Sequence, residues 1–148
     1  MSITKLNDAV KQYNQVGVAA SVESADPHRL IQMLMQGALE KVAIAKGYME
    51  REDIANKGAH ISWAISIVEG LRASLNKDQG GEIAQNLDDL YDYMIRRLLR
   101  ANVENNIDIL DEVSSLLTSV KTAWDEVPEH LEQPSGNTAD GSSRPADV

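Results

Sequence analysis

Histidines and clustered carboxylates are the residues of this sequence whose types could support chemistry. The three histidines, His28, His60 and His130, lie far apart along the chain. A di-iron site in a helical bundle needs Glu-x-x-His on two helices, and the sequence contains no such motif. Cysteine, glycine-rich phosphate loops and G-x-S-x-G motifs are also absent. We therefore expect no cofactor, no metal site and no catalytic residue, and we do not expect an enzyme.

His60 supports one specific alternative. A histidine in the middle of a bundle helix can accept a phosphoryl group, and domains that do so share a Lys-Gly pair soon after the histidine. Here Lys57 and Gly58 precede His60, and Ile61 to Trp63 follow it. We interpret His60 as a histidine on the flank of a helix, and we keep phosphotransfer as an alternative function.

An acidic cluster, Asp88, Asp89 and Asp92, resembles a catalytic group in composition alone. Helical spacing spreads the three side chains over one side of a helix, so we predict a solvated face. Asp92 and Arg96 form an i,i+4 pair in the favoured order. The basic cluster near the end of the same segment, Arg96, Arg97 and Arg100, complements the helix dipole.

Composition excludes other classes of protein. The formal net charge is −9 over 148 residues, and such a surface repels the nucleic-acid backbone. No apolar run approaches the roughly 20 residues that span a bilayer, and residues 1–10 lack the pattern of a signal peptide. We expect a cytosolic protein without a nucleic-acid partner and without membrane insertion.

Hydrophobic residues recur with helical spacing in five segments, at about residues 3–16, 27–50, 53–75, 82–103 and 107–127. Asp26 and Pro27 mark a helix start. Residues 76–81 are predicted to form a turn around Gly80-Gly81. Asn105-Asn106 should end one helix and separate it from the last. Four long helices with short connections predict an all-α, antiparallel up-down four-helix bundle over residues 26–127. Residues 1–17 should form a short amphipathic segment packed as a cap, and residues 128–148 a disordered tail.

The sequence carries more apolar side chains than one core stripe per helix requires. Met35, Leu39, Trp63 and Ile67 are the clearest of these. They either fill a second contact between helices or line a groove for a partner helix, where Met and aromatic residues are useful. The N-terminal seam of Leu6, Val10 and Tyr13 fits a fixed element, or a latch that occupies the groove until a partner displaces it.

Short motifs follow one another along the chain in a fixed order. They are Asp26-Pro-His-Arg-Leu-Ile-Gln-Met-Leu with its continuation to Leu39, Ile67-Val-Glu-Gly-Leu-Arg-Ala-Ser-Leu75, Gly80-Gly-Glu-Ile-Ala84, Leu90-Tyr-Asp-Tyr-Met-Ile-Arg-Arg-Leu98, Asp111-Glu-Val and Ala123-Trp124. Tyr13 adds an N-terminal tyrosine. Together these motifs resemble the flagellar secretion chaperones, the FliS family, over about residues 10–127.

The resemblance implies a cytosolic export chaperone. Such a protein binds the disordered C-terminal segment of flagellin, prevents its premature polymerisation and keeps it competent for flagellar type III export. The resemblance also implies an N-terminal segment that shifts on binding and a contact with the flagellar export gate. A self-associating structural bundle without a client is a further alternative.

Apolar character away from the main stripes predicts the partner contacts. These residues are Val10, Tyr13, Ile31, Met35, Leu39, Trp63, Ile67 and Tyr91. Two departures from the family pattern affect nearby positions. The family often has Phe-Asp at Met35-Gln36, where Met keeps the apolar volume and adds flexibility. It often has Gly at Glu52, and a left-handed conformation there would cost about 1 kcal/mol.

Overall fold

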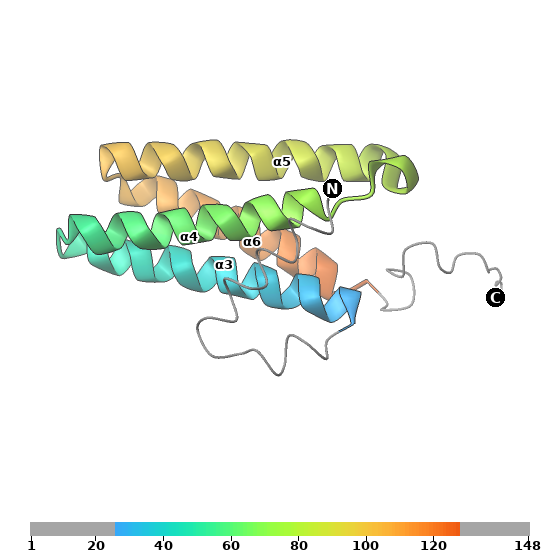
Figure 1. Cartoon of the computed structure of the whole chain (residues 1–148), viewed down its shortest axis with the longest axis horizontal. Helices are drawn as coiled ribbons and strands as arrows, with labels where there is room; N and C mark the ends of the chain where they lie inside the picture. The colour runs from blue at the N-terminus through green and yellow to red at the C-terminus, as the bar shows by residue number, and fades with distance from the viewer. Residues whose placement is uncertain (1–25, 128–148) are drawn as a thin grey trace.

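Four α-helices make up residues 26–127, the part of the chain that the computed structural model describes. They are α3 (Pro27–Glu50), α4 (Ile54–Ala73), α5 (Lys77–Glu104) and α6 (Ile107–Asp125). Successive helices run in opposite directions (Figure 1), and no strand occurs among these residues. The predicted all-α bundle is confirmed. The N-terminal cap segment, with Val10 and Tyr13, and the C-terminal tail lie outside the described residues.

Each helix begins after an Asp or Asn that caps its first turn. The capping residues are Asp26, Asp53, Asn76 and Asn106. In every case a side-chain oxygen accepts a hydrogen bond from the backbone N–H three residues later. This contact satisfies one of the donors that a helix start leaves unpaired. Pro27 at the first helical position confirms the predicted start of α3.

The connection between α4 and α5 differs from the prediction of a turn over residues 76–81. Because Asn76 caps a helix start, α5 begins at Lys77, and one helical turn precedes the break. The break falls at Gly81 alone, where φ is 55° and ψ is −130°. A side chain at this backbone conformation is strained, so glycine is required there.

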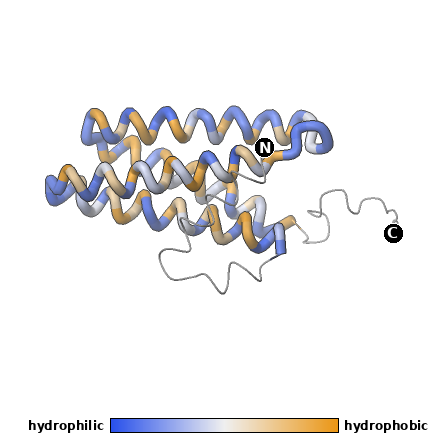
Figure 2. The backbone as a smooth tube through the Cα atoms, viewed as in Figure 1, coloured by the Kyte–Doolittle hydropathy of each residue, from blue (hydrophilic) through white to orange (hydrophobic). Residues whose placement is uncertain are grey.

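The core lies between the four helices and is almost entirely aliphatic. α3 and α5 each pack against both α4 and α6, so the helices enclose one apolar interior. Figure 2 shows hydrophobic positions recurring along each helix between hydrophilic ones. Residues with essentially no exposed surface include Ala38, Ile61, Val68, Met94, Leu98, Leu110, Val113 and Leu117.

A reciprocal contact joins the start of α3 to the end of α6. The indole Nε1–H of Trp124 donates to the backbone carbonyl of His28 at 3.0 Å, and His28 Nε2 lies 3.0 Å from the carbonyl of Trp124. The two rings stack with their centroids 5.0 Å apart. His28 is buried, and this histidine at a helix start holds the first described helix against the end of the last one.

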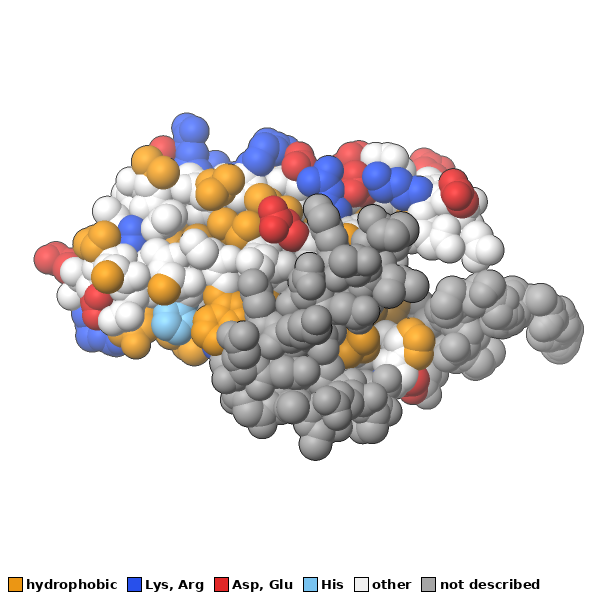
Figure 3. All heavy atoms as spheres, viewed as in Figure 1, with side chains coloured by type: hydrophobic (Ala, Val, Ile, Leu, Met, Phe, Trp, Pro, Cys, Tyr) orange, Lys and Arg blue, Asp and Glu red, His pale blue; other side chains and the backbone are white. Residues whose placement is uncertain are grey.

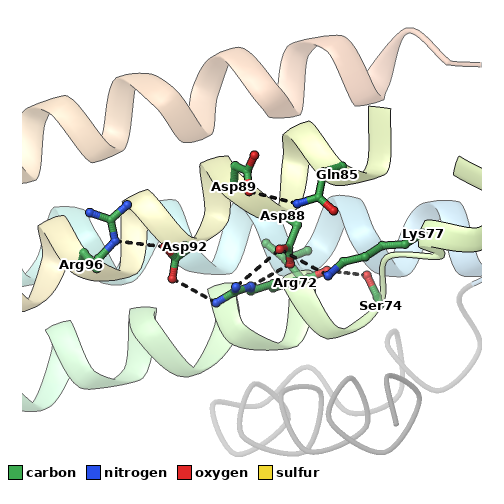
Figure 4. A network of polar contacts seen from close by, with 9 residues as sticks. Arg72, Ser74, Lys77, Gln85, Asp88, Asp89, Asp92 and Arg96 are labelled. Carbon is green, nitrogen blue, oxygen red and sulfur yellow. Dashed lines mark hydrogen bonds and ion pairs between the residues drawn. The ribbon is translucent and has the colours of Figure 1, made fainter. Parts of the chain in front are cut away.

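A network of charged side chains joins the end of α4 to α5 (Figure 4). Arg72 donates to both carboxylate oxygens of Asp88, at 2.7 and 3.4 Å, and to Asp92 at 3.1 Å. Lys77 approaches Asp88 to 3.3 Å, and Arg96 donates to Asp92 at 3.0 Å. The predicted Asp92–Arg96 pair is therefore present. The predicted solvated face is wrong for Asp88, which is buried because Arg72 reaches it from the neighbouring helix.

Replacing Asp88 with Asn should lower the free energy of unfolding at neutral pH by about 1–3 kcal/mol, the usual loss for a charged hydrogen bond. The hydrogen bond from Arg72 holds the pKa of Asp88 below its ordinary value of 3.8. Its contribution is therefore complete above that pH and disappears as the pH falls further. Urea unfolding between pH 2.5 and 7 measures both effects.

The matched control for this prediction is Asp89→Asn. Asp89 is exposed and accepts a hydrogen bond only from Gln85 of the same helix among the described residues, at 3.1 Å. This variant should stay within about 0.5 kcal/mol of the original chain. Equal losses from the two substitutions would show that the network does not stabilise the α4–α5 connection.

The turn between α3 and α4 contains a strained residue. Glu52 has a φ of 61°, the left-handed conformation considered from the sequence. The backbone N–H of Glu52 donates to the carbonyl of Met49 at 3.1 Å, and that of Asp53 donates to the carbonyl of Tyr48 at 2.9 Å. These two bonds form a Schellman motif, whose left-handed position favours glycine.

Glu52→Gly should raise the melting temperature by a few degrees, because it relieves left-handed strain of about 1 kcal/mol. Thermal unfolding followed by circular dichroism measures the change. Glu50→Gly is the control, since Glu50 ends α3 in a helical conformation and glycine there should lower the melting temperature. A decrease with Glu52→Gly would contradict the strain assigned to this turn.

Candidate functional site

Aromatic side chains follow the outer seam between α3 and α4. The ring centroids of Tyr48 and His60 lie 5.3 Å apart, and those of His60 and Trp63 lie 6.1 Å apart. We call these three residues the aromatic seam. Lys41 Nζ lies 3.9 Å from the centroid of the Trp63 ring, and the Arg51 guanidinium lies 4.9 Å from that of Tyr48. A cation therefore lies against the aromatic ring at each end of the row.

Helix geometry explains why these side chains meet. Lys41 and Tyr48 are seven residues apart, so they project from the same side of α3. His60 and Trp63 are three residues apart on α4 and also share a side. The Nδ1 atom of His60 lies 2.9 Å from the carbonyl of Asn56, so this nitrogen carries the proton in the contact. His60 is half-buried within this row, as expected for a histidine on a helix flank.

Trp63 is the largest side chain on this seam. It is half-buried and packs against the core. Its indole Nε1 is buried and has no hydrogen-bond acceptor among the described residues. An unpaired buried donor costs about 1–3 kcal/mol.

Leu39 lies on a different side of α3 from Lys41 and Tyr48. Gln32 donates to Asp125 of α6, and Lys46 donates to Asp111 of α6, both at 2.8 Å. Leu39 is seven residues from each of them, so it shares the α6 side of the helix. Leu39 and Ile31 are half-buried at the edge of the core. We call the side of α3 that carries Leu39 the α6 seam. Ile31 is eight residues before Leu39 and ten before Lys41, so helix geometry places it between the α6 seam and the aromatic seam.

The remaining predicted partner contacts within the described residues are core side chains. Met35, Ile67 and Tyr91 expose 1%, 0% and 2% of their surface. Burial raises the pKa of the Tyr91 hydroxyl above its ordinary value. The six described positions therefore do not form one continuous patch: Ile31 and Leu39 reach the surface from α3, Trp63 reaches it from α4, and the other three lie beneath.

Sequence reasoning did not include Lys41 and Tyr48 among the contact residues, although both belong to the aromatic seam. Their seven-residue spacing was the available signal, because it matches the periodicity that places side chains on one helix face. Figure 3 shows hydrophobic side chains beside a histidine on this face of the molecule. Lys41 itself is 7% exposed, which a sequence does not predict for a lysine.

The site is suited to binding apolar and aromatic groups. Within residues 26–127, no three His, Cys, Asp or Glu side chains lie close enough to hold a metal ion. In the same range, none of the helices combines the length and the apolar character that crossing a membrane requires. The two seams beside α3 are edged by charged side chains.

Comparison with known proteins identifies the family. Residues 9–131 match the family described as "Flagellar protein FliS". The chain is 56% identical over 119 residues to the flagellar secretion chaperone FliSB of Pseudomonas aeruginosa, covering 80% of this chain and 94% of the relative. It is 46% identical to the flagellar secretion chaperone FliS of Salmonella typhimurium, covering 80% and 88%.

A relative with lower sequence identity also matches most of the chain. The chain is 34% identical over 104 residues to the flagellar secretion chaperone FliS of Bacillus subtilis, covering 70% of this chain and 77% of that protein. The fold, the ordered motifs and these identities agree with one another. The chain belongs to the FliS family of flagellar secretion chaperones.

Proposed function

We propose that this chain is a cytosolic export chaperone for flagellin. It binds the disordered C-terminal segment of flagellin, prevents its premature polymerisation and keeps it competent for flagellar type III export. The observation that carries the proposal is membership of a family whose relatives are named flagellar secretion chaperones. The apolar seams on two sides of α3 support it, because a flagellin segment that folds into helices needs apolar strips to pack on.

Two separate seams favour an extended client over a compact one. The aromatic seam and the α6 seam are on different sides of α3, so one short helix cannot cover both. A segment that forms helices on contact can follow the surface from one seam to the other. Ordering that segment opposes binding, and the apolar area that it buries favours binding.

The partner contacts divide into direct and supporting residues. In this proposal Ile31, Leu39 and Trp63 contact flagellin through their partly exposed side chains. Met35, Ile67 and Tyr91 hold these side chains in position from beneath. Val10 and Tyr13 belong to an N-terminal latch that moves when flagellin binds. The flagellar export gate is the proposed second partner.

Calorimetric titration of the full chain with a peptide covering the last ~40 residues of flagellin from the same cell tests the proposal, since that length allows two or three ordinary helices. We expect binding with a clearly negative heat-capacity change, the mark of apolar burial. No binding at high micromolar concentration would contradict the assignment of flagellin as the client.

Trp63→Ala should weaken binding of this peptide by about 10–100-fold, because the substitution removes the largest aromatic contact of the seam. Helicity measured by circular dichroism should stay near that of the original chain. Val103→Ser is the control, since Val103 is 82% exposed on α5, away from both seams. Unchanged affinity in Trp63→Ala would remove the aromatic seam from the binding site while leaving the client open.

A further inference from the structure

The C-terminal half of α5 carries an exposed row of side chains that the bundle does not use. Arg96, Leu99, Arg100 and Val103 have the spacing i, i+3, i+4, i+7, which places them on one side of the helix. Leu99 is 52% exposed and Val103 is 82% exposed. The side chains of Arg96 and Arg100 are each 62% exposed. We call these four residues the basic–apolar face.

The face points away from the core. Met94, Leu98 and Ala101, on the inner side of the same helix, are completely buried. Among the described helices, only α4 and α6 pack closely against α5, and neither covers the basic–apolar face. Along this part of α5, Figure 3 shows hydrophobic side chains next to Lys and Arg side chains. Single exposed aliphatic residues are common, but a pair one helical turn apart that alternates with two arginines has the pattern of a helix-binding surface.

The charges on the face are held only weakly within the chain. Arg96 pairs with Asp92 at 3.0 Å and Arg100 with Glu104 at 2.9 Å, both as i,i+4 pairs on the exposed surface. Such pairs stabilise a protein little, so a partner's carboxylates can replace them. Arg97 is different, because Glu112 of α6 holds it at 2.9 Å.

The charge of the whole chain selects the kind of partner. At a net charge of −9, the chain repels anionic groups in general. In the other half of α5, Asp88 pairs with Arg72 and Lys77, and Asp92 pairs with Arg72 (Figure 4). The basic–apolar face is a local exception to this field. Arginine binds carboxylates with two parallel hydrogen bonds, and exposed Leu and Val need apolar side chains against them.

We infer that the basic–apolar face of α5 docks an acidic amphipathic helix of a partner protein. The apolar side of that helix packs on Leu99 and Val103, and its Glu or Asp side chains pair with Arg96 and Arg100. This surface is separate from the seams of α3, so the inference does not depend on flagellin being the client. It gives the chaperone a second protein contact that can be occupied while the first is filled.

The test uses the full chain labelled with ¹⁵N and a synthetic helical peptide of about 18 residues, five helical turns. The peptide has leucines one turn apart, flanked by glutamates. In low salt we expect saturable amide shift changes confined to residues 95–104. A matched peptide with Gln for each Glu should bind about fivefold more weakly or worse, because it lacks the charges that pair with the arginines.

Variants of the chain locate the contact. Leu99→Ser with Val103→Ser should weaken the acidic peptide about tenfold, and Arg96→Gln with Arg100→Gln about fivefold. Both pairs are exposed, so helicity and melting temperature should change little. The Leu99→Ser, Val103→Ser variant should bind the flagellin peptide with an affinity within about twofold of that of the original chain. If the original chain does not bind the flagellin peptide, the variant should not bind it either.

Several outcomes would overturn the inference. No shift changes, or changes outside residues 95–104, would show that the face does not bind such a helix. Equal binding of the Gln peptide, or of a peptide with Lys in place of Glu, would contradict the charge complementarity. Sedimentation of the unliganded chain as a dimer that the Leu99→Ser, Val103→Ser variant abolishes would assign the face to a second copy. A tenfold loss of flagellin-peptide binding in that variant would make the face part of the client site.

Discussion

Closure of the bundle between its first and last described helices is the constraint on which the other contacts depend. α3 packs mainly on α4 and α6, so the core is enclosed only when α6 returns to α3. The reciprocal hydrogen bonds of His28 and Trp124 fix the ends of these two helices across 96 residues of sequence. Since that contact sets where α3 lies against α6, it also sets where Ile31 and Leu39 reach the surface.

Most of the fold was predictable because its signals are local. Asp26 and Pro27 define a helix start within a few residues, and apolar spacing defines which side of each helix is buried. The glycine break was predicted, but the start of α5 was placed at about residue 82 instead of Lys77, because Asn76 caps one helical turn before the break at Gly81. Asp88 was assigned to a solvated face because its partner Arg72 belongs to another helix, and sequence spacing within one helix carries no information about that contact.

The binding surface was harder to predict for the same reason. An apolar residue outside the main stripe is either exposed or covered by a neighbouring helix, and only the packing decides. Trp63 and Leu39 remain partly exposed, whereas Met35, Ile67 and Tyr91 are covered. Lys41 is the converse case, a charged residue that packing places against an aromatic ring. The seven-residue spacing could have placed Lys41 on the same helix side as Tyr48. How deeply Lys41 is buried depends on the packing of α4.

Closure by α6 also determines the order in which the protein can form during synthesis. A ribosome adds about 5–20 residues per second, so α6 is complete roughly 4–15 s after α3, while a helix forms in about a microsecond. The α3–α4 hairpin therefore has time to assemble before any residue of α6 exists. Throughout that interval the α6-facing side of α3 is open to water and to other nascent chains, and the final helix ends this exposure when Trp124 reaches His28.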